Sequence, residues 1–303
     1  MDYILQTNNI CKNYGSAKVL QGITMNIPKG SIYGFVGRNG AGKTTLIRVV
    51  TGLHNPTSGE YSLYGISNSD KKILDIRKKT GAVVETPSIY LEENAKENLK
   101  LQCSLLGYGT ERIDEVLHLV GLSNTGKKRA KNFSLGMRQR LGIAMCLMSN
   151  PDFLFLDEPT NGLDPQGIIE IRELLLDLNR KHNITILISS HILDELSKLA
   201  THYGFIEKGK IIREMSSEEL ENSSKSYTKI TVSDIKIFSN VLDEMKLNYK
   251  IISETEANVF SDFKLTPLVL TLHEKGCEVI SMSENHEGLE SYFVNLVGGE
   301  HNV

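Results

Sequence analysis

The sequence predicts an α/β fold built on a parallel β-sheet, followed by a small α+β domain. Three observations support this prediction. A glycine-rich segment, residues 37–44, lies between an apolar run typical of a buried strand and a run typical of a helix. Strand and helix patterns then alternate from residue 153 to residue 188, as in parallel sheets covered by helices. From residue 228 the order becomes strand, helix, strand, strand, helix, strand, which is the ferredoxin-like order.

The patterns assign the elements in chain order. The first thirty residues read as β structure, with apolar side chains alternating over residues 23–27 and a turn after them. The elements expected next are a strand at 32–36, a helix at 45–50, a strand at 60–64, a helical region at 88–150, a strand at 153–156, a helix at 168–181 and a strand at 184–188. A capping pattern, S-x-x-E at 216–219, begins the last helix of this part.

The polar run at residues 222–226 reads as a linker between two domains. We therefore expect a first domain at 1–222, a linker at 223–227 and a small α+β domain at 228–303. The elements expected in the second domain are strands at 228–232, 249–252, 257–260 and 279–282, and helices at 235–245, 265–275 and 288–296.

Composition limits the function classes. A chain of 303 residues with 40% hydrophobic content is long enough for about two domains with buried cores. The net charge of -3 argues against a dedicated nucleic-acid binder. No apolar stretch approaches the roughly 18 to 20 residues that span a bilayer, and the N-terminus lacks a signal-peptide pattern. We therefore expect a cytosolic chain that reaches a membrane only through partners, with its four scattered cysteines as reduced thiols.

The glycine-rich segment fits the phosphate-binding pattern G-x-x-x-x-G-K-[ST] at every fixed position. Its residues are Gly37, Arg38, Asn39, Gly40, Ala41, Gly42, Lys43 and Thr44, with Thr45 following in the helix. In this pattern backbone N–H groups and the helix N-terminus surround the phosphates, the lysine reaches the β/γ-phosphates, and the threonine hydroxyl helps hold Mg²⁺. We therefore predict a P-loop NTPase that binds a nucleoside triphosphate with Mg²⁺. An ordinary glycine-rich turn is the alternative.

Two acidic residues, Asp157 and Glu158, follow the buried strand at 153–156. Ligands of open α/β sheets bind at the carboxyl ends of the strands, so these carboxylates are expected beside the phosphate loop. We assign Asp157 to the Mg²⁺ shell and Glu158 to the attacking water, which it would orient or deprotonate. The alternative is that both acids simply end the strand.

Four more features complete a recognisable set. They are the segment F-S-L-G-M-R-Q at 133–139, N-G-L-D-P at 161–165, S-S-H at 189–191 and an aromatic residue, Tyr14, before a glycine. With these features the sequence closely resembles the ATPase subunits of ATP-binding cassette (ABC) transporters, over about residues 3–220. The resemblance implies a parallel sheet core, an antiparallel β subdomain and a helical subdomain at about 88–150.

The resemblance also implies residue roles. Ser134, Leu135, Gly136 and Met137 match the signature segment, which in this family faces the ATP of a second subunit, so a head-to-tail dimer with a second copy or a related ATPase is expected. Ser134 precedes a helix expected to begin near Met137, and a helix N-terminus with a hydroxyl suits a γ-phosphate. His191 would sense the γ-phosphate and Tyr14 would stack on adenine. The alternatives are that Ser134 only caps a helix and that His191 and Tyr14 only pack.

Two departures from the family pattern stand out. Leu135 replaces a glycine in the signature, and Glu85 replaces a glutamine that touches the metal site and reports to the membrane subunit. Glu85 keeps an oxygen ligand for Mg²⁺ but adds a negative charge. Together with the small C-terminal domain and its tail at 289–294, these features resemble the subgroup that serves bacitracin-type and lantibiotic self-protection.

The resemblance therefore implies an ATP hydrolase that drives export of, or resistance to, a peptide antibiotic. It would act at the cytoplasmic face of the membrane through separate permease subunits, whose coupling helices would dock near Glu85. The alternatives are an exporter ATPase for another substrate, an importer ATPase, or a soluble or regulatory ABC ATPase without a membrane partner. Basic clusters at 71–79 and 127–131 read as solvated surface, with acidic loops of a partner as the alternative to that reading; nucleic acid is not expected.

Overall fold

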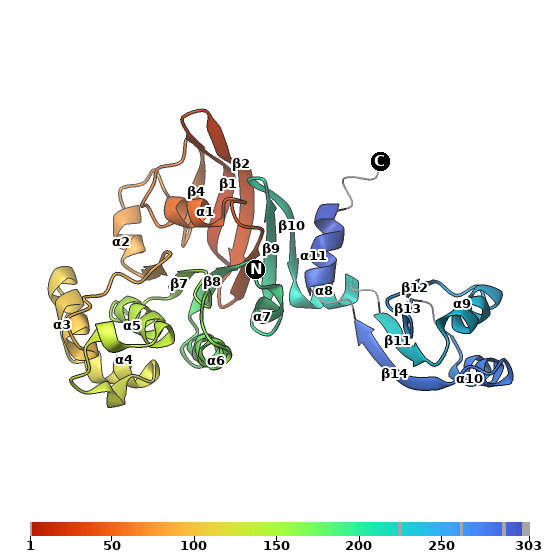
Figure 1. Cartoon of the computed structure of the whole chain (residues 1–303). Helices are drawn as coiled ribbons and strands as arrows, with labels where there is room; N and C mark the ends of the chain where they lie inside the picture. Colours follow the sequence, from red (N-terminus) through yellow and green to blue (C-terminus); the bar gives the residue numbers. More distant parts are fainter. Residues whose placement is uncertain (1, 224–225, 261–262, 287–288, 299–303) are drawn as a thin grey trace. The chain divides into compact units, whose positions relative to one another are not determined.

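The computed structural model describes residues 2–223, 226–260, 263–286 and 289–298. Contacts between residues divide the chain into two compact units, residues 1–217 and 218–303 (Figure 1). The boundaries expected at residues 222 and 228 remain predictions. Regular structure enters the expected linker from both sides, because α8 (Ser217–Ser223) ends and β11 (Ser226–Val232) begins within it.

A six-stranded sheet forms the centre of the first unit, in the order β10-β9-β3-β8-β7-β6. Its members are β3 (Ile32–Val36), β6 (Thr80–Val83), β7 (Phe153–Asp157), β8 (Thr185–Ser190), β9 (His202–Glu207) and β10 (Lys210–Ser216). Every pairing is parallel except that of β9 with β10. The residues of β3 and β7 are buried throughout, which explains their unbroken apolar runs.

The strand register brings three chain segments to one edge of this sheet. Val36, the last residue of β3, lies opposite Ser190 of β8, and Asp157 of β7 lies opposite Ser189. The chain that leaves β3 is the phosphate loop. The loop, the acidic pair and the serine pair therefore meet at the carboxyl ends of neighbouring parallel strands, as expected from the sequence.

An antiparallel sheet in the order β2-β1-β4-β5 forms the second layer of this unit. It consists of β1 (Tyr3–Tyr14), β2 (Ala17–Pro28), β4 (Ser58–Leu63) and β5 (Ile66–Ser67). The helix α1 (Lys43–Val50) contributes Leu46, Ile47, Val49 and Val50 to one core with side chains of β1, β2 and β7. This burial fixes α1, and with it the phosphate loop that precedes it.

A helical part covers residues 95–147 and contains α3 (Ala95–Leu106), α4 (Ile113–Leu119), the 3₁₀ helices η1 (Ser123–Thr125) and η2 (Ala130–Asn132), and α5 (Leu135–Leu147). It is yellow to green in Figure 1. The helix α5 packs against α3, α4, β6 and α6 (Pro165–His182), so it joins the helical part to the sheet. The shorter helices α2 (Ile73–Arg77) and α7 (Leu193–Ser197) complete the unit.

The second unit has the expected ferredoxin-like topology. Its strands β11, β12 (Tyr249–Ile251), β13 (Glu256–Val259) and β14 (Val279–His286) form an antiparallel sheet in the order β12-β13-β11-β14. Side chains of α9 (Ile235–Glu244) and α10 (Leu265–Glu274), among them Phe238 and Leu272, form its buried core with Ile230 and Val259 of the sheet. The helix α11 (Leu289–Gly298) follows β14, while Gly288, where it was expected to begin, lies outside the described residues.

Three helices begin earlier than expected, each because of its cap. The helix after the phosphate loop starts at Lys43 rather than Thr45, because Gly42 is its N-cap. The signature helix α5 starts at Leu135 rather than near Met137, because the Ser134 hydroxyl caps it. The helix α6 starts at Pro165 rather than residue 168, because the Asp164 carboxylate accepts a bond from the Gly167 N–H.

Candidate nucleotide-binding and hydrolysis site

The phosphate loop has a backbone shape that depends on its glycines. Gly42 has a φ of 112° and Gly40 a φ of 81°, both in the region that residues with a Cβ rarely adopt. A Cβ on Gly37 would lie 2.6 Å from the Ile206 carbonyl oxygen, so no side chain fits there. The Gly209 N–H donates to the Ala41 carbonyl at 3.0 Å and ties the loop to the turn between β9 and β10. Contact with Ile206 at Gly37 and the hydrogen bond from Gly209 to Ala41 therefore fix the loop against β9 and the turn that follows it.

The loop offers its backbone to solvent on one side only. Arg38, Asn39 and Gly40 are exposed, whereas Gly37, Ala41, Gly42 and Lys43 are buried, and Thr44 and Thr45 are half-buried. The unpaired N–H groups of the first turn of α1 follow directly. A curved loop that leads into a helix N-terminus is an arrangement that favours anions such as phosphate.

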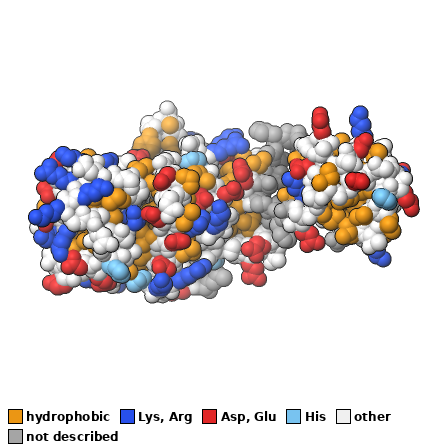
Figure 2. Space-filling model, turned by 60° about the horizontal axis from the view of Figure 1, so that its bottom comes forward, with side chains coloured by type: hydrophobic (Ala, Val, Ile, Leu, Met, Phe, Trp, Pro, Cys, Tyr) orange, Lys and Arg blue, Asp and Glu red, His pale blue; other side chains and the backbone are white. Residues whose placement is uncertain are grey.

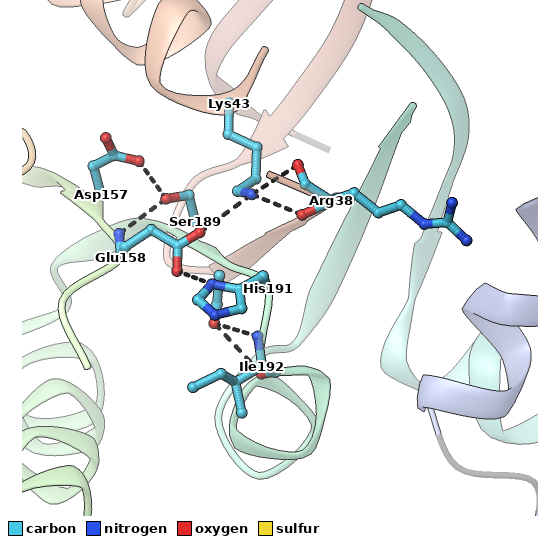
Figure 3. Close-up of polar contacts among 9 residues, drawn as sticks. Arg38, Lys43, Asp157, Glu158, Ser189, His191 and Ile192 are labelled. Carbon is cyan, nitrogen blue, oxygen red and sulfur yellow. Dashed lines mark hydrogen bonds and ion pairs between the residues drawn. The ribbon is translucent and has the colours of Figure 1, made fainter. Parts of the chain in front are cut away.

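Lys43 carries a buried charge at the centre of the site, with 6% of its side chain exposed (Figure 3). Its ammonium donates to the carbonyl oxygens of Gly37 at 2.7 Å and Arg38 at 3.3 Å, and it pairs with Glu158 Oε1 at 3.2 Å. A buried ammonium with these partners is fixed in position. The structure thus places Lys43 and Glu158 in direct contact.

Ser189 organises the acidic pair. Its hydroxyl donates to Asp157 Oδ1 at 2.6 Å and accepts from the Glu158 backbone N–H at 3.0 Å. Asp157 is buried, and Glu158 has a φ of 50°, a left-handed conformation uncommon for a residue with a side chain. Such a conformation persists where the surroundings impose it, and it occurs often at functional sites.

The role of Ser189 was not predicted from the sequence, in which this residue stood out only as a neighbour of His191. The available signal was a hydroxyl residue at the end of a buried parallel strand, beside the strand that ends in Asp157. Ser189 is fully buried, so its hydroxyl needs a partner within the fold.

His191 is on the same network. Its Nδ1 lies 2.7 Å from Glu158 Oε2, and its side chain is partly exposed. One carboxylate, that of Glu158, therefore faces Lys43 with one oxygen and His191 with the other (Figure 3). Lys43, Glu158 and His191 therefore form one polar cluster beside the phosphate loop.

The expected Mg²⁺ ligands differ in how well they fit. Thr44 supplies a half-buried hydroxyl at the start of α1, and Asp157 a buried carboxylate at the end of β7; oxygen donors of this kind suit Mg²⁺. Glu85 is different, because its Oε1 pairs with Arg48 Nη2 at 2.8 Å and 60% of its side chain is exposed. The pairing of Glu85 with Arg48 was not predicted from the sequence.

The signature segment lies at the start of α5. The Ser134 hydroxyl accepts from the Met137 N–H at 3.2 Å, so it does cap the helix. Ser134 and Leu135 are exposed, the latter by 45%, while Gly136 is buried. A Cβ placed on Gly162 would lie 3.3 Å from Leu135 Cδ2, which shows that the signature and the 161–165 loop are neighbours.

Gln139, which was also not predicted as a site residue, connects this helix to the segment that follows Glu158. It is buried, and its Nε2 donates to the Pro159 carbonyl at 3.2 Å, one residue after Glu158. Ile143 and Leu147 are buried at the same helical spacing. The signal was therefore a polar side chain on the core-facing side of a helix.

Tyr14 ends β1 with 43% of its surface exposed. Its hydroxyl lies 2.6 Å from His54 Nδ1. The ring is thus not core packing, the alternative that the sequence left open.

The basic clusters are partly neutralised surface. Arg129 and Lys131 both pair with Glu92, and Lys78 pairs with Asp75. On the face shown in Figure 2, lysine and arginine side chains gather toward the left end and are mixed with acidic ones.

All four cysteines are free thiols, and burial raises the pKa of Cys146 to about 12, which keeps this thiol protonated. Within the described ranges no helix is long and apolar enough to cross a membrane.

Comparison with known proteins finds similarity to ATP-binding proteins of transporters. A sequence profile described as ABC transporter matches residues 20–161. The bacitracin transport ATP-binding protein BcrA of Bacillus licheniformis is 41% identical over 307 residues, covering 99% of both chains. The lantibiotic transport ATP-binding protein SrtF of Streptococcus pyogenes is 44% identical over 219 residues, covering 72% of this chain and 93% of that protein.

Solved structures agree. The cbiO1 protein of Clostridium perfringens, part of an ABC transporter complex, has a TM-score of 0.67 at 26% identity and covers 81% of this chain and 97% of that one. A dimeric ATP-binding cassette in a post-hydrolysis state, bound to ADP and Pi, has a TM-score of 0.63 at 25% identity and covers 70% of this chain and 98% of that one.

Proposed function

This chain belongs to the ATP-binding subunits of ABC transporters, which hydrolyse ATP, and we propose that it drives export of, or resistance to, a peptide antibiotic of the bacitracin or lantibiotic type. The observation that supports the substrate class is the full-length similarity to a bacitracin transport protein. That similarity extends over the second unit, whereas the match to the lantibiotic transport protein covers 72% of the chain.

The geometry supports separate roles for the groups around the γ-phosphate: some bind the phosphates, and others act on the attacking water. The loop amides and Lys43 bind the phosphates, and the phosphate oxygens compete with Glu158 for the ammonium. Glu158 then accepts a proton from the attacking water while His191 holds its other oxygen. The water oxygen bonds to the γ-phosphorus as the bond to the β-bridging oxygen breaks, which yields ADP and inorganic phosphate.

Thr44 and Asp157 would hold Mg²⁺, which supplies positive charge to the phosphate oxygens when bound. We propose Glu85 as a further contributor, although its carboxylate pairs with Arg48. In that case Glu85→Gln raises the Mg²⁺ concentration needed for half-maximal hydrolysis, and Arg48→Met, which frees the carboxylate, lowers it. An unchanged requirement in both variants excludes Glu85 from the metal site.

The exposed signature supports a head-to-tail dimer. Ser134 and Leu135 present a helix N-terminus to solvent, with the hydroxyl in place. In the proposed dimer this surface closes over the ATP bound by the phosphate loop of the partner. Hydrolysis then removes the charge that holds the two chains together.

A pocket of about 460 Å³ supports docking of the membrane subunits. It lies beside Glu85, between the end of β6 and the helical part, and its lining includes Leu53, Arg77, Val84, Gln102, Gly142 and Met145. We propose that a short helix of a permease subunit occupies it and holds this chain at the cytoplasmic face of the membrane. Its apolar and polar side chains are mixed, as in most such recognition sites.

The test is antibiotic resistance in a bacitracin-sensitive host. Expression of this chain with its permease subunits is expected to raise the bacitracin concentration that stops growth, and the Glu158→Gln variant is the matched inactive control. If active chain and permease together leave resistance to bacitracin and lantibiotics unchanged while ATP is hydrolysed, the substrate class is wrong and an exporter for another compound is favoured.

A further inference from the structure

The aromatic ring of Tyr14 contacts His54, which lies outside its own strand, and Lys12, which lies within it. Its hydroxyl lies 2.6 Å from His54 Nδ1, and the two rings meet edge to face, with centroids 5.8 Å apart and planes at 73°. The Lys12 ammonium lies over the Tyr14 ring, 5.1 Å from its centroid. The same ammonium donates to the Asn55 carbonyl at 2.7 Å, so it is itself fixed.

The segment that contains His54 and Asn55, residues 54–57, follows the phosphate-loop helix. The His54 N–H donates to the Arg48 carbonyl of α1 at 3.0 Å. At the other end of the segment, Thr57 Oγ1 accepts from the Asn13 N–H at 2.9 Å, and the Thr57 N–H donates to the Cys11 carbonyl at 2.8 Å. One continuous piece of chain therefore joins the phosphate loop, through α1, to the end of β1 that carries Tyr14.

We propose that His54 is a positioning residue for base recognition: it fixes the Tyr14 ring at a set angle relative to the phosphate loop, ready for a purine to stack. This inference rests on the proposed role of Tyr14 in the ATP site. Lys12 occupies one face of the ring, so the base stacks on the other face. His54 acts through Tyr14 and touches neither the base nor the phosphates.

The expected gain comes from preorganisation. An exposed tyrosine at the end of a strand has several rotamers, and binding a base would have to immobilise it. The bond to His54 meets this cost before the nucleotide arrives, and edge-to-face ring contact adds to it. Ordering one side chain in advance corresponds to about a threefold to tenfold improvement in the dissociation constant for ATP.

The test compares two probes on the full-length chain by calorimetry with Mg²⁺ present: ATP, and inorganic tripolyphosphate, which has phosphates but no base. His54→Phe keeps a ring and removes the nitrogen that is hydrogen-bonded to the Tyr14 hydroxyl. It is expected to weaken ATP binding about threefold to tenfold and to leave tripolyphosphate binding unchanged. His54→Gln restores a side chain that can hydrogen-bond the Tyr14 hydroxyl and is expected to recover ATP affinity, and Tyr14→Phe is expected to add nothing to His54→Phe.

Two results would overturn the proposal. Equal weakening of ATP and tripolyphosphate in His54→Phe would mean that His54 only supports α1 and the phosphate loop. Unchanged ATP affinity would mean that the ring needs no anchoring. Failure of the proposed nucleotide site looks different, since Lys43→Ala would then leave both probes unaffected, or Tyr14→Ala would leave ATP binding unaffected.

Discussion

The phosphate loop and the signature segment differ in how complete they are within one chain. Around the loop, Lys43 is buried and bonded to two carbonyl oxygens and to Glu158, and Ser189 joins the two acids. At the signature, Ser134 and Leu135 face solvent at a capped helix N-terminus. We call the phosphate loop with Lys43, Glu158 and Ser189 the built half-site, because its contacts are complete within one chain. We call the signature at Ser134 and Leu135 the surface half-site, because it is exposed and needs a second molecule to cover it.

This difference follows from the physical demands on each half. A loop that binds phosphates by backbone amides must hold an unusual backbone shape, so it is tied to α1, β9 and β10. A surface that engages a second molecule must instead stay accessible. It needs its shape fixed only from behind, and the Gln139 bond to the Pro159 carbonyl supplies such support.

The largest effect is expected where the built half-site does chemistry. Glu158→Gln removes the proton acceptor while keeping the side-chain shape, and hydrolysis is expected to fall by about 10²- to 10⁴-fold. Release of phosphate from ATP measures it, with exposed Glu60→Gln as the control. Normal turnover in Glu158→Gln would contradict the role given to this carboxylate.

The next effect concerns binding in the same half-site. Lys43→Ala deletes the buried cation and leaves Glu158 without it, so ATP binding is expected to weaken by about 10- to 100-fold. Calorimetric titration with MgATP measures the change. If the affinity for MgATP were unchanged, the phosphate loop would not be the site that binds the phosphates of ATP.

A smaller effect is expected at the surface half-site, and it separates capping from phosphate contact. Ser134→Asp keeps a good N-cap but points a negative charge at the place proposed for the partner's γ-phosphate. Hydrolysis is expected to fall at least about tenfold with ATP affinity of the single chain unchanged. If Ser134→Asp hydrolyses ATP normally, Ser134 is only a helix cap.

The smallest effect lies away from both half-sites, at the junction of the two sheets of the first unit. Glu214 Oε1 accepts from the Tyr33 hydroxyl at 2.6 Å and from the Asn26 N–H at 3.0 Å. Burial raises the pKa of Glu214, and these bonds offset it only in part. Because the folded state favours the protonated acid, stability is present below the ordinary glutamate pKa and is lost as pH rises through the raised value.

Glu214→Gln keeps the acceptor and cannot ionise. The melting temperature of the variant relative to the parent is therefore expected to increase between about pH 4 and about pH 7. A difference that stays constant over this range would show that ionisation of Glu214 does not affect folding. Neither half-site should change, so ATP affinity is the control.

Most of the fold and the built half-site were predictable because their signals are local. The loop pattern, the apolar runs of β3 and β7, and the acids after β7 are each contained in a few residues. The ferredoxin-like order of the second unit was predicted in the same way and is confirmed by its sheet. The helices that begin at Lys43 and Leu135 were predicted to begin two residues later, because the apolar pattern does not mark the residue that caps a helix.

The remaining features could not be predicted because they depend on residues distant in sequence. Arg48 meets Glu85, and His54 meets Tyr14, only once the two layers of the unit are packed. The roles of the site residues toward ATP and Mg²⁺ stay predictions, as do those of the signature toward a second chain.

The central claim is that the two half-sites of different chains close on shared ATP. The most direct measurement is the mass in solution of Glu158→Gln with and without ATP, by light scattering. The account predicts a chain of 33.8 kDa without nucleotide and about twice that mass with ATP, and no doubling when Ser134→Asp is added to Glu158→Gln. A Glu158→Gln chain that binds ATP and keeps its single-chain mass would contradict the account.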